Sequence, residues 1–204
     1  MRRPKLRELK EAVTALVRGP YTIKYPYEPS ILPETFRGKP EYVDEECVGC
    51  GACAQVCPAK AIEITEKVDG SSGKRKLTLR YDHCIFCGQC HRNCTTEKGI
   101  ILTNEYDLAT YNRAEAKTEV EKDLLICEHC GAIIGTMDHI RWVARKLGAQ
   151  AYSNMGLALT LYKDLALVPE TKPHPEIPLA RSDRLRFLCP KCHRELILLE
   201  QWHP

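Results

Sequence analysis

Residues 47–58 read CVGCGACAQVCP, and residues 84–95 read CIFCGQCHRNCT. Each stretch holds four cysteines in the spacing C-x2-C-x2-C-x3-C. The two sets lie at a constant offset, because 84 − 47 and 94 − 57 both equal 37. A constant offset over a whole set of identical residues indicates an internal repeat. The sequence therefore predicts two related halves that each present four thiols.

The spacing of these thiols is typical of iron–sulfur clusters. A C-x2-C-x2-C loop curls three thiolates around one face of an iron–sulfur cube, and the fourth cysteine, expected to begin a helix, points away. In two-cluster ferredoxins this fourth cysteine ligates the other cluster. The predicted ligands of the first [4Fe–4S] cluster are Cys47, Cys50, Cys53 and Cys94, and those of the second are Cys84, Cys87, Cys90 and Cys57. Two zinc sites are the alternative, but they rarely exchange one ligand in this way.

Residues around the motifs fit cluster binding. Gly49, Gly51 and Gly88 are expected to adopt positive φ and to let backbone N–H groups approach the sulfurs. Six apolar residues are predicted to shield the clusters from water or simply to pack in the core: Ile62, Ile64, Ile85, Phe86, Ile100 and Ile101.

The composition excludes several other classes. All 12 cysteines of the 204-residue chain fall in C-x2-C groups, which hold metal more readily than they connect distant loops as disulfides. The basic N-terminus MRRPKLRELKEAV lacks the features of a secretory signal, and no run of 18 apolar residues predicts a membrane span. A net charge of +3 does not indicate nucleic-acid binding.

The remaining cysteines form two further C-x2-C pairs. They are Cys127 and Cys130 in CEHCG, and Cys189 and Cys192 in CPKCH. Two such pairs make a tetrahedral four-sulfur site, for which we expect structural zinc, with a single rubredoxin-like iron or a third cluster as alternatives. His129 and His193 are interpreted as solvent-facing neighbours and not as ligands.

Helical patterns lie outside the motifs. KLRELKEAVTALV (residues 5–17) predicts an amphipathic helix on a partner, on a membrane or on its own domain. A proline-rich stretch over residues 19–46 predicts an extended arm. Between the last two cysteine pairs, Thr136 as N-cap and Gly148 as stop bound one predicted helix, and a second is expected to begin near Ser153.

From about Tyr21 to Leu125 the chain resembles the two-cluster ferredoxin-like subunit of respiratory complex I and of related membrane-bound [NiFe] hydrogenases and formate hydrogenlyases. Four stretches carry the resemblance: YTIKYPYE, FRGKPEY, CIFCGQC and NEYDLATYNRAEAKTEVEKDLL. The resemblance implies a subunit that passes electrons between a donor and a cluster beside another subunit's catalytic site. It also implies partners, namely a small iron–sulfur subunit, a hydrogenase-like large subunit, and a ferredoxin or another protein as electron donor. The C-terminal four-cysteine module favours the hydrogenase-type relatives.

We therefore predict an α+β fold with three parts. Residues 1–46 form a helix and arm, 47–126 a ferredoxin-like domain with two [4Fe–4S] clusters, and 127–204 a four-cysteine metal module with a helical insert. The expected role is non-catalytic electron relay in a membrane-associated complex, at the cytoplasmic side and peripheral, with no catalytic residue. A quinone- or sulfur-reducing assembly, a free ferredoxin shuttle, a catalytic iron–sulfur enzyme and a zinc-knuckle RNA-binding module are the alternatives.

Overall fold

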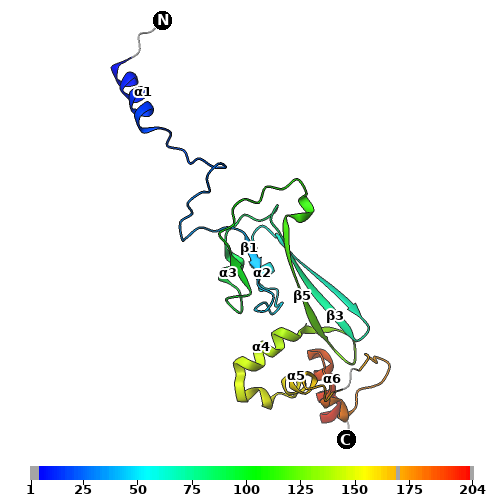
Figure 1. Ribbon diagram of the computed structural model, residues 1–204. Helices are drawn as coiled ribbons and strands as arrows, with labels where there is room; N and C mark the ends of the chain where they lie inside the picture. The colour runs from blue at the N-terminus through cyan, green and yellow to red at the C-terminus, as the bar shows by residue number, and fades with distance from the viewer. Residues whose placement is uncertain (1–4, 169–170, 203–204) are drawn as a thin grey trace. The chain divides into compact units, whose positions relative to one another are not determined.

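The computed structural model describes residues 5–168 and 171–202 (Figure 1). Two compact units are found, residues 1–36 and residues 37–204. The strand pairs are antiparallel, and only short helical turns lie between strands while the longer helices precede or follow them, which confirms the predicted α+β class. No helix among the described residues is long and apolar enough to cross a membrane.

The first unit contains the predicted amphipathic helix, α1 (Leu6–Arg18). Its N-terminus is capped by Glu8, whose carboxylate accepts a hydrogen bond from the backbone N–H of Lys5. None of the 13 residues of α1 is buried, and Leu6 and Leu16 are 86% and 85% exposed. The apolar stripe of α1 is therefore not covered by the described residues of its own unit.

The second unit begins with a small two-stranded sheet. Strand β1 (Pro40–Tyr42) pairs antiparallel with β4 (Ile100–Leu102). The pairing continues beyond the strands, because the N–H of Gly38 donates to Thr103 and that of Lys39 to Glu105. A side chain on Gly38 would lie 2.3 Å from the Thr103 carbonyl oxygen, so only glycine fits there. The FRGKPEY stretch is thus held against the start of the NEYDL stretch.

A four-stranded antiparallel sheet forms the centre of this unit. Its strand order is β2 (Ile62–Asp69), β3 (Ser72–Arg80), β5 (Lys117–Ile126) and β6 (Ile133–Thr136). Gly70, with φ of 60°, makes the two-residue turn of the β2–β3 hairpin. Leu77 and Leu79 on β3 are both 1% exposed and pack towards the cysteine loops.

Each cysteine motif forms a loop followed by a single helical turn. These turns are α2 (Ala52–Gln55) and α3 (Gln89–Arg92). The glycines before them have the predicted left-handed backbone, with φ of 82° at Gly51 and 75° at Gly88. The chain after Cys57 forms a turn and not a helix, so the expected helix at this fourth cysteine is wrong.

Helices make up most of the C-terminal part. They are α4 (Met137–Leu147), α5 (Met155–Asp164) and α6 (Pro190–Trp202), with 3-10 turns η2 (Gly148–Ser153) and η3 (Arg181–Leu185) between them and η1 (Arg113–Glu115) before β5. Both predicted helices are present, the second capped by Asn154, whose side chain accepts from the N–H of Leu157. Helix α6, which carries Cys192, was not predicted from the sequence.

The central sheet connects the region of the cysteine loops with the C-terminal helices. Strand β5 pairs with β3 along one edge and with β6 along the other, and β6 leads directly into α4. Leu125, Met137, Leu159 and Phe187 form a separate apolar core below these helices. The division at residues 46/47 and 126/127 stays a prediction, although β1 lies in the same unit as the motifs.

Candidate metal centres

The four cysteines predicted for the first cluster line one cavity of about 300 Å³. Cys47, Cys50 and Cys53 come from the first loop, and Cys94 comes from the turn after α3. The Cys50 sulfur lies 3.1 Å from the hydroxyl of Thr95, the neighbour of Cys94. Three thiols from one motif and one from the other therefore face a common space, as the repeat predicts.

Burial makes this cavity a poor place for free thiolates. It raises the pKa of Cys47 and raises that of Cys53 to about 11. At Cys47 the N–H of Gly49 and the charge of Lys122 lower the pKa and so oppose the effect of burial. The hydroxyl of Tyr42 lies 3.8 Å from the Cys53 sulfur. Bound iron would supply the positive charge that such buried thiolates need.

The second group is assembled in the same way. Burial raises the pKa of Cys84, and the charges of Cys57 and Cys87 raise it further, which is consistent with Cys57 lying near the second motif although it belongs to the first. Backbone N–H groups point at these sulfurs, from Ala61 to Cys57 at 3.3 Å and from Phe86 to Cys84 at 3.4 Å. The residues thus fit two clusters with one exchanged ligand each, and the ligation itself stays a prediction.

The two loops differ in their exposure. Ile62 and Ile100 are buried at 7% and 1%, consistent with the predicted shielding. Ile85 is 62% exposed, so its predicted shielding role is wrong in this chain, and Ile64 and Ile101 are more than a third exposed. The first loop is mostly buried, whereas most residues of the second are half-buried or exposed.

Gly49 illustrates why the first loop is constrained. Its φ is 64°, and its equivalent in the repeat, at 49 + 37 = 86, is Phe86 with φ of 52°. A side chain at Gly49 would lie 3.0 Å from Cγ of Lys122 and 3.0 Å from Cγ2 of Thr136. Both loops therefore have a positive φ at this position, and only the second loop has room for a side chain there.

We expect Gly49→Ala to destabilise the chain by about 1–3 kcal/mol more than Gly70→Ala, because it adds overpacking to the backbone strain. Gly70 is the matched control, since its φ is 60° and no heavy atom lies within 4 Å of an added Cβ. Urea unfolding under anaerobic conditions measures the difference. Equal midpoints for the two variants would contradict the packing of Lys122 and Thr136 against this loop.

The last four cysteines form a compact four-sulfur group. The sulfurs of Cys127, Cys130, Cys189 and Cys192 all lie within 4.8 Å of one another. Those of Cys130 and Cys189 are 3.6 Å apart, close to the separation of about 3.8 Å in a tetrahedral site with metal–sulfur bonds of 2.3 Å. Cys127 lies in the β5–β6 connection and Cys189 just before α6, so these thiols join the sheet to the last helix.

His129 lies beside this group and is not a solvent-facing neighbour as predicted. Its Nδ1 is 3.5 Å from the Cys192 sulfur and its Nε2 is 3.2 Å from the Ile177 carbonyl oxygen. A neutral imidazole carries one N–H, so His129 can donate either to the ligand sulfur or to the Ile177 carbonyl, and only the imidazolium donates to both. His193 is exposed, as predicted.

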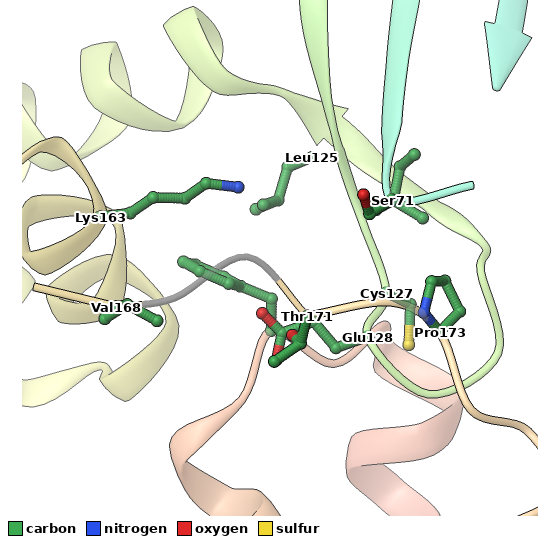
Figure 2. A pocket seen from close by; sticks show the side chains of 10 residues that line it. Ser71, Leu125, Cys127, Glu128, Lys163, Val168, Thr171 and Pro173 are labelled. Atoms are coloured by element: carbon green, nitrogen blue, oxygen red, sulfur yellow. The ribbon is translucent and has the colours of Figure 1, made fainter. Parts of the chain in front are cut away.

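A pocket of about 410 Å³ adjoins the four-cysteine group (Figure 2). Leu125, Val168 and Phe187 supply its apolar wall, and Lys163 reaches over the Phe187 ring with its Nζ 5.8 Å from the ring centre. Glu128 supplies the one carboxylate among the lining residues. The pocket continues the core below α4 and α5, and these residues do not pair a nucleophile with a base.

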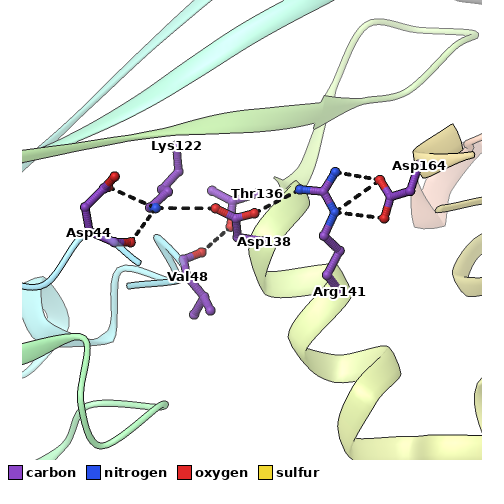
Figure 3. Close-up of polar contacts among 7 residues, drawn as sticks. All are labelled: Asp44, Val48, Lys122, Thr136, Asp138, Arg141 and Asp164. Atoms are coloured by element: carbon purple, nitrogen blue, oxygen red, sulfur yellow. Dashed lines mark hydrogen bonds and ion pairs between the residues drawn. The ribbon is translucent and has the colours of Figure 1, made fainter. Parts of the chain in front are cut away.

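A chain of polar contacts connects the first cysteine loop with the helices (Figure 3). Nζ of Lys122 lies 3.0 Å from Asp44 Oδ1 and 3.4 Å from Asp138 Oδ2, and Arg141 joins Asp138 to Asp164. Sequence reasoning missed Lys122. The alternation of buried and exposed side chains along β5 could have revealed it, because Lys122 shares a face with buried Val120 and Leu124. A lysine on a covered face is expected to have acidic partners.

Comparison with known proteins agrees with this geometry. The family model of the 4Fe-4S dicluster domain matches residues 46–98. NADH-quinone oxidoreductase subunit I 2 of Geobacter metallireducens is 32% identical over 118 residues, which are 55% of this chain and 89% of that protein. The chain belongs to the subunit I family of NADH-quinone oxidoreductases.

Other subunit I relatives are longer than the matched region. The chain is 35% identical over 101 residues to NAD(P)H-quinone oxidoreductase subunit I of Gloeobacter violaceus, covering 48% of each protein. Formate hydrogenlyase subunit 6 of Escherichia coli is 37% identical over 112 residues, 55% of this chain and 61% of that protein. The chain thus spans about half the length of the first curated relatives that it matches.

Proposed function

We propose that this chain is an electron-transfer subunit that relays single electrons through two [4Fe–4S] clusters within a membrane-associated oxidoreductase complex. The first cluster is held by Cys47, Cys50, Cys53 and Cys94, and the second by Cys84, Cys87, Cys90 and Cys57. The observation that carries the proposal is the grouping of Cys94 with the three cysteines of the first motif around one cavity, and the effect of Cys57 on the pKa of Cys84 supports the reciprocal placement. Exchange of one ligand each sets the clusters side by side.

Backbone N–H groups and buried apolar side chains of this chain surround both proposed cluster sites, where the charge would change by one electron. Each cluster, when bound, accepts and releases one electron. Backbone N–H groups directed at the sulfurs stabilise the added negative charge, and buried Ile62, Leu79 and Ile100 keep water away. The cysteines act as ligands and not as nucleophiles, so the chain conducts electrons and leaves bond chemistry to other subunits.

Partner subunits follow from the uncovered parts of the chain and from its family. Helix α1 has an apolar stripe without any buried residue, which is what a segment that docks on another protein or a membrane surface presents. The relatives are named as subunits of NADH-quinone oxidoreductase and of formate hydrogenlyase. We infer a peripheral position at the cytoplasmic side of a membrane complex of the hydrogenase or formate hydrogenlyase type, with a small iron–sulfur subunit and a hydrogenase-like large subunit as partners.

For the C-terminal group we propose structural zinc. Four thiols whose sulfurs lie within 4.8 Å of one another suit a closed four-coordinate Zn²⁺ site, and a single iron can bind the same thiolates. The metal would hold the β5–β6 connection and the start of α6 in place. Such a site stabilises a small module whose apolar core is limited.

Isolation from native membranes in mild detergent tests the proposed role. We expect the chain to copurify with several subunits, including a hydrogenase-like large subunit with nickel. A related assembly without nickel would indicate the quinone- or sulfur-reducing alternative. Recovery of the chain alone from the soluble fraction would contradict the subunit role and favour a free ferredoxin shuttle.

A further inference from the structure

The helical module contacts the first cysteine loop through the side chain of Thr136. This residue stands at the N-cap of α4, where a threonine oxygen commonly accepts from the helix's own N–H groups. No such cap bond is formed here. Instead the Thr136 hydroxyl, fully buried at 0% exposure, donates to the carbonyl oxygen of Val48 at 2.5 Å (Figure 3). The first turn of α4 is thus joined to the loop between Cys47 and Cys50.

The Val48 carbonyl belongs to the same peptide group as the Gly49 N–H. Because a trans peptide is planar, its carbonyl and its N–H point in opposite directions. Thr136 holds the carbonyl on one side, and on the other side the Gly49 N–H faces the Cys47 sulfur, where it counteracts the rise in the Cys47 pKa that burial causes. The next carbonyl, that of Gly49, accepts from Nη1 of Arg75 at 2.9 Å. The orientation of this N–H is therefore fixed from outside the loop.

A hydrogen bond to the carbonyl also strengthens the N–H as a donor. Hydrogen bonds in series polarise one another, so the Thr136 hydroxyl makes the Gly49 N–H more positive towards the sulfur. An added electron increases the negative charge on the cluster and its ligand sulfurs. A better N–H donor stabilises the reduced form and raises the reduction potential.

The second half of the repeat keeps the sulfur contact but lacks this cover. Phe86, the equivalent of Gly49, donates its N–H to the Cys84 sulfur at 3.4 Å. Ile85, the equivalent of Val48, is 62% exposed, whereas Val48 is 9% exposed. Ile85 is thus open to solvent whereas Val48 is covered, so the two loops differ in their surroundings.

We propose that Thr136 is a positioning residue for the first cluster, acting through the Val48–Gly49 peptide group to raise the potential of this cluster and leaving the second unaffected. The inference rests on the proposed function, because it requires Cys47 to be a cluster ligand. Thr136 would thereby give the C-terminal module an effect on the potential of the first cluster, in addition to its structural role.

An anaerobic redox titration of the full chain, followed by electron paramagnetic resonance, tests the proposal on Thr136→Val and Thr136→Ser. The signal of the first cluster is assigned as the one lost in Cys50→Ser. At a fixed ambient potential we expect Thr136→Val to lower the ratio of reduced to oxidised first cluster about threefold, which is about 30 mV for a one-electron couple. Thr136→Ser, which keeps the hydroxyl, should restore the wild-type ratio.

Thr160→Val is the matched control for module stability. Thr160 is 2% exposed in α5, and its hydroxyl donates to the Leu157 carbonyl within its own helix. We expect this variant to leave both potentials unchanged. Equal shifts in Thr160→Val and Thr136→Val, equal shifts of both clusters, or no shift in Thr136→Val would overturn the inference. A wild-type chain that binds no cluster would contradict the proposed function as well, and is recognised by its iron content.

Discussion

Cys94→Ser is expected to abolish the first cluster, although Cys94 stands in the second motif. Its side chain lines the same cavity as Cys47, Cys50 and Cys53, and a serine hydroxyl is a much weaker iron ligand than a thiolate. We expect the iron content of the reconstituted chain to fall from about eight to about four atoms. Iron and sulfide analysis, combined with electron paramagnetic resonance, measures the loss.

The reciprocal variant Cys57→Ser is the matched control. Cys57 acts on Cys84 electrostatically, so its loss should remove the second signal and keep the first. A Cys94→Ser chain that retains the first signal and loses only the second would show that each motif holds its own cluster. The exchange of ligands would then be wrong, and with it the close placement of the two clusters.

Cys189→Ser is expected to empty the four-cysteine site and to destabilise the C-terminal module. Structural zinc in small modules contributes on the order of 10 kcal/mol to folding, which exceeds what this module's apolar core can replace. We expect zinc to fall from about one atom per chain to near zero and amide protons in α4, α5 and α6 to exchange faster. Inductively coupled plasma mass spectrometry and hydrogen exchange measure the two effects.

His193→Ala serves as the control for Cys189→Ser. His193 is exposed and directly follows Cys192, so its loss should leave the metal content unchanged. Both cluster signals should persist in both variants. Disappearance of a third iron–sulfur signal in Cys189→Ser would contradict zinc and favour a third cluster at this site.

Local rules accounted for the parts of the structure that depend on short stretches of chain. The spacing of cluster ligands is set by the cluster itself, so the repeat, together with the pattern of two-cluster ferredoxins, predicted that Cys94 would lie beside the first motif; the ligation of both clusters stays a prediction. Helix α4 was predicted from Thr136 and Gly148, since capping and termination act within one turn. The positive φ of Gly51 followed from the same local reasoning.

Contacts between residues far apart in the sequence could not be predicted from these local rules. Thr136 was predicted as an N-cap, but its hydroxyl donates to Val48, 88 residues away. Ile85 was expected to shield a cluster because it is apolar, whereas its exposure depends on the absence of cover from other described elements. Gly49 was explained by its positive φ and by the approach of its N–H to the sulfurs, and the packing of Lys122 against it was not predicted. Each miss concerns a tertiary contact and not a local preference.

The measurement that tests the central claim most directly is anaerobic reconstitution of the full chain, followed by iron and sulfide analysis and electron paramagnetic resonance of the reduced protein. The account predicts about eight iron and eight sulfide per chain and two one-electron centres whose spins interact, because the exchanged ligands keep the clusters close. Iron without acid-labile sulfide, or zinc at the eight cysteines of the two motifs, would contradict a two-cluster electron relay.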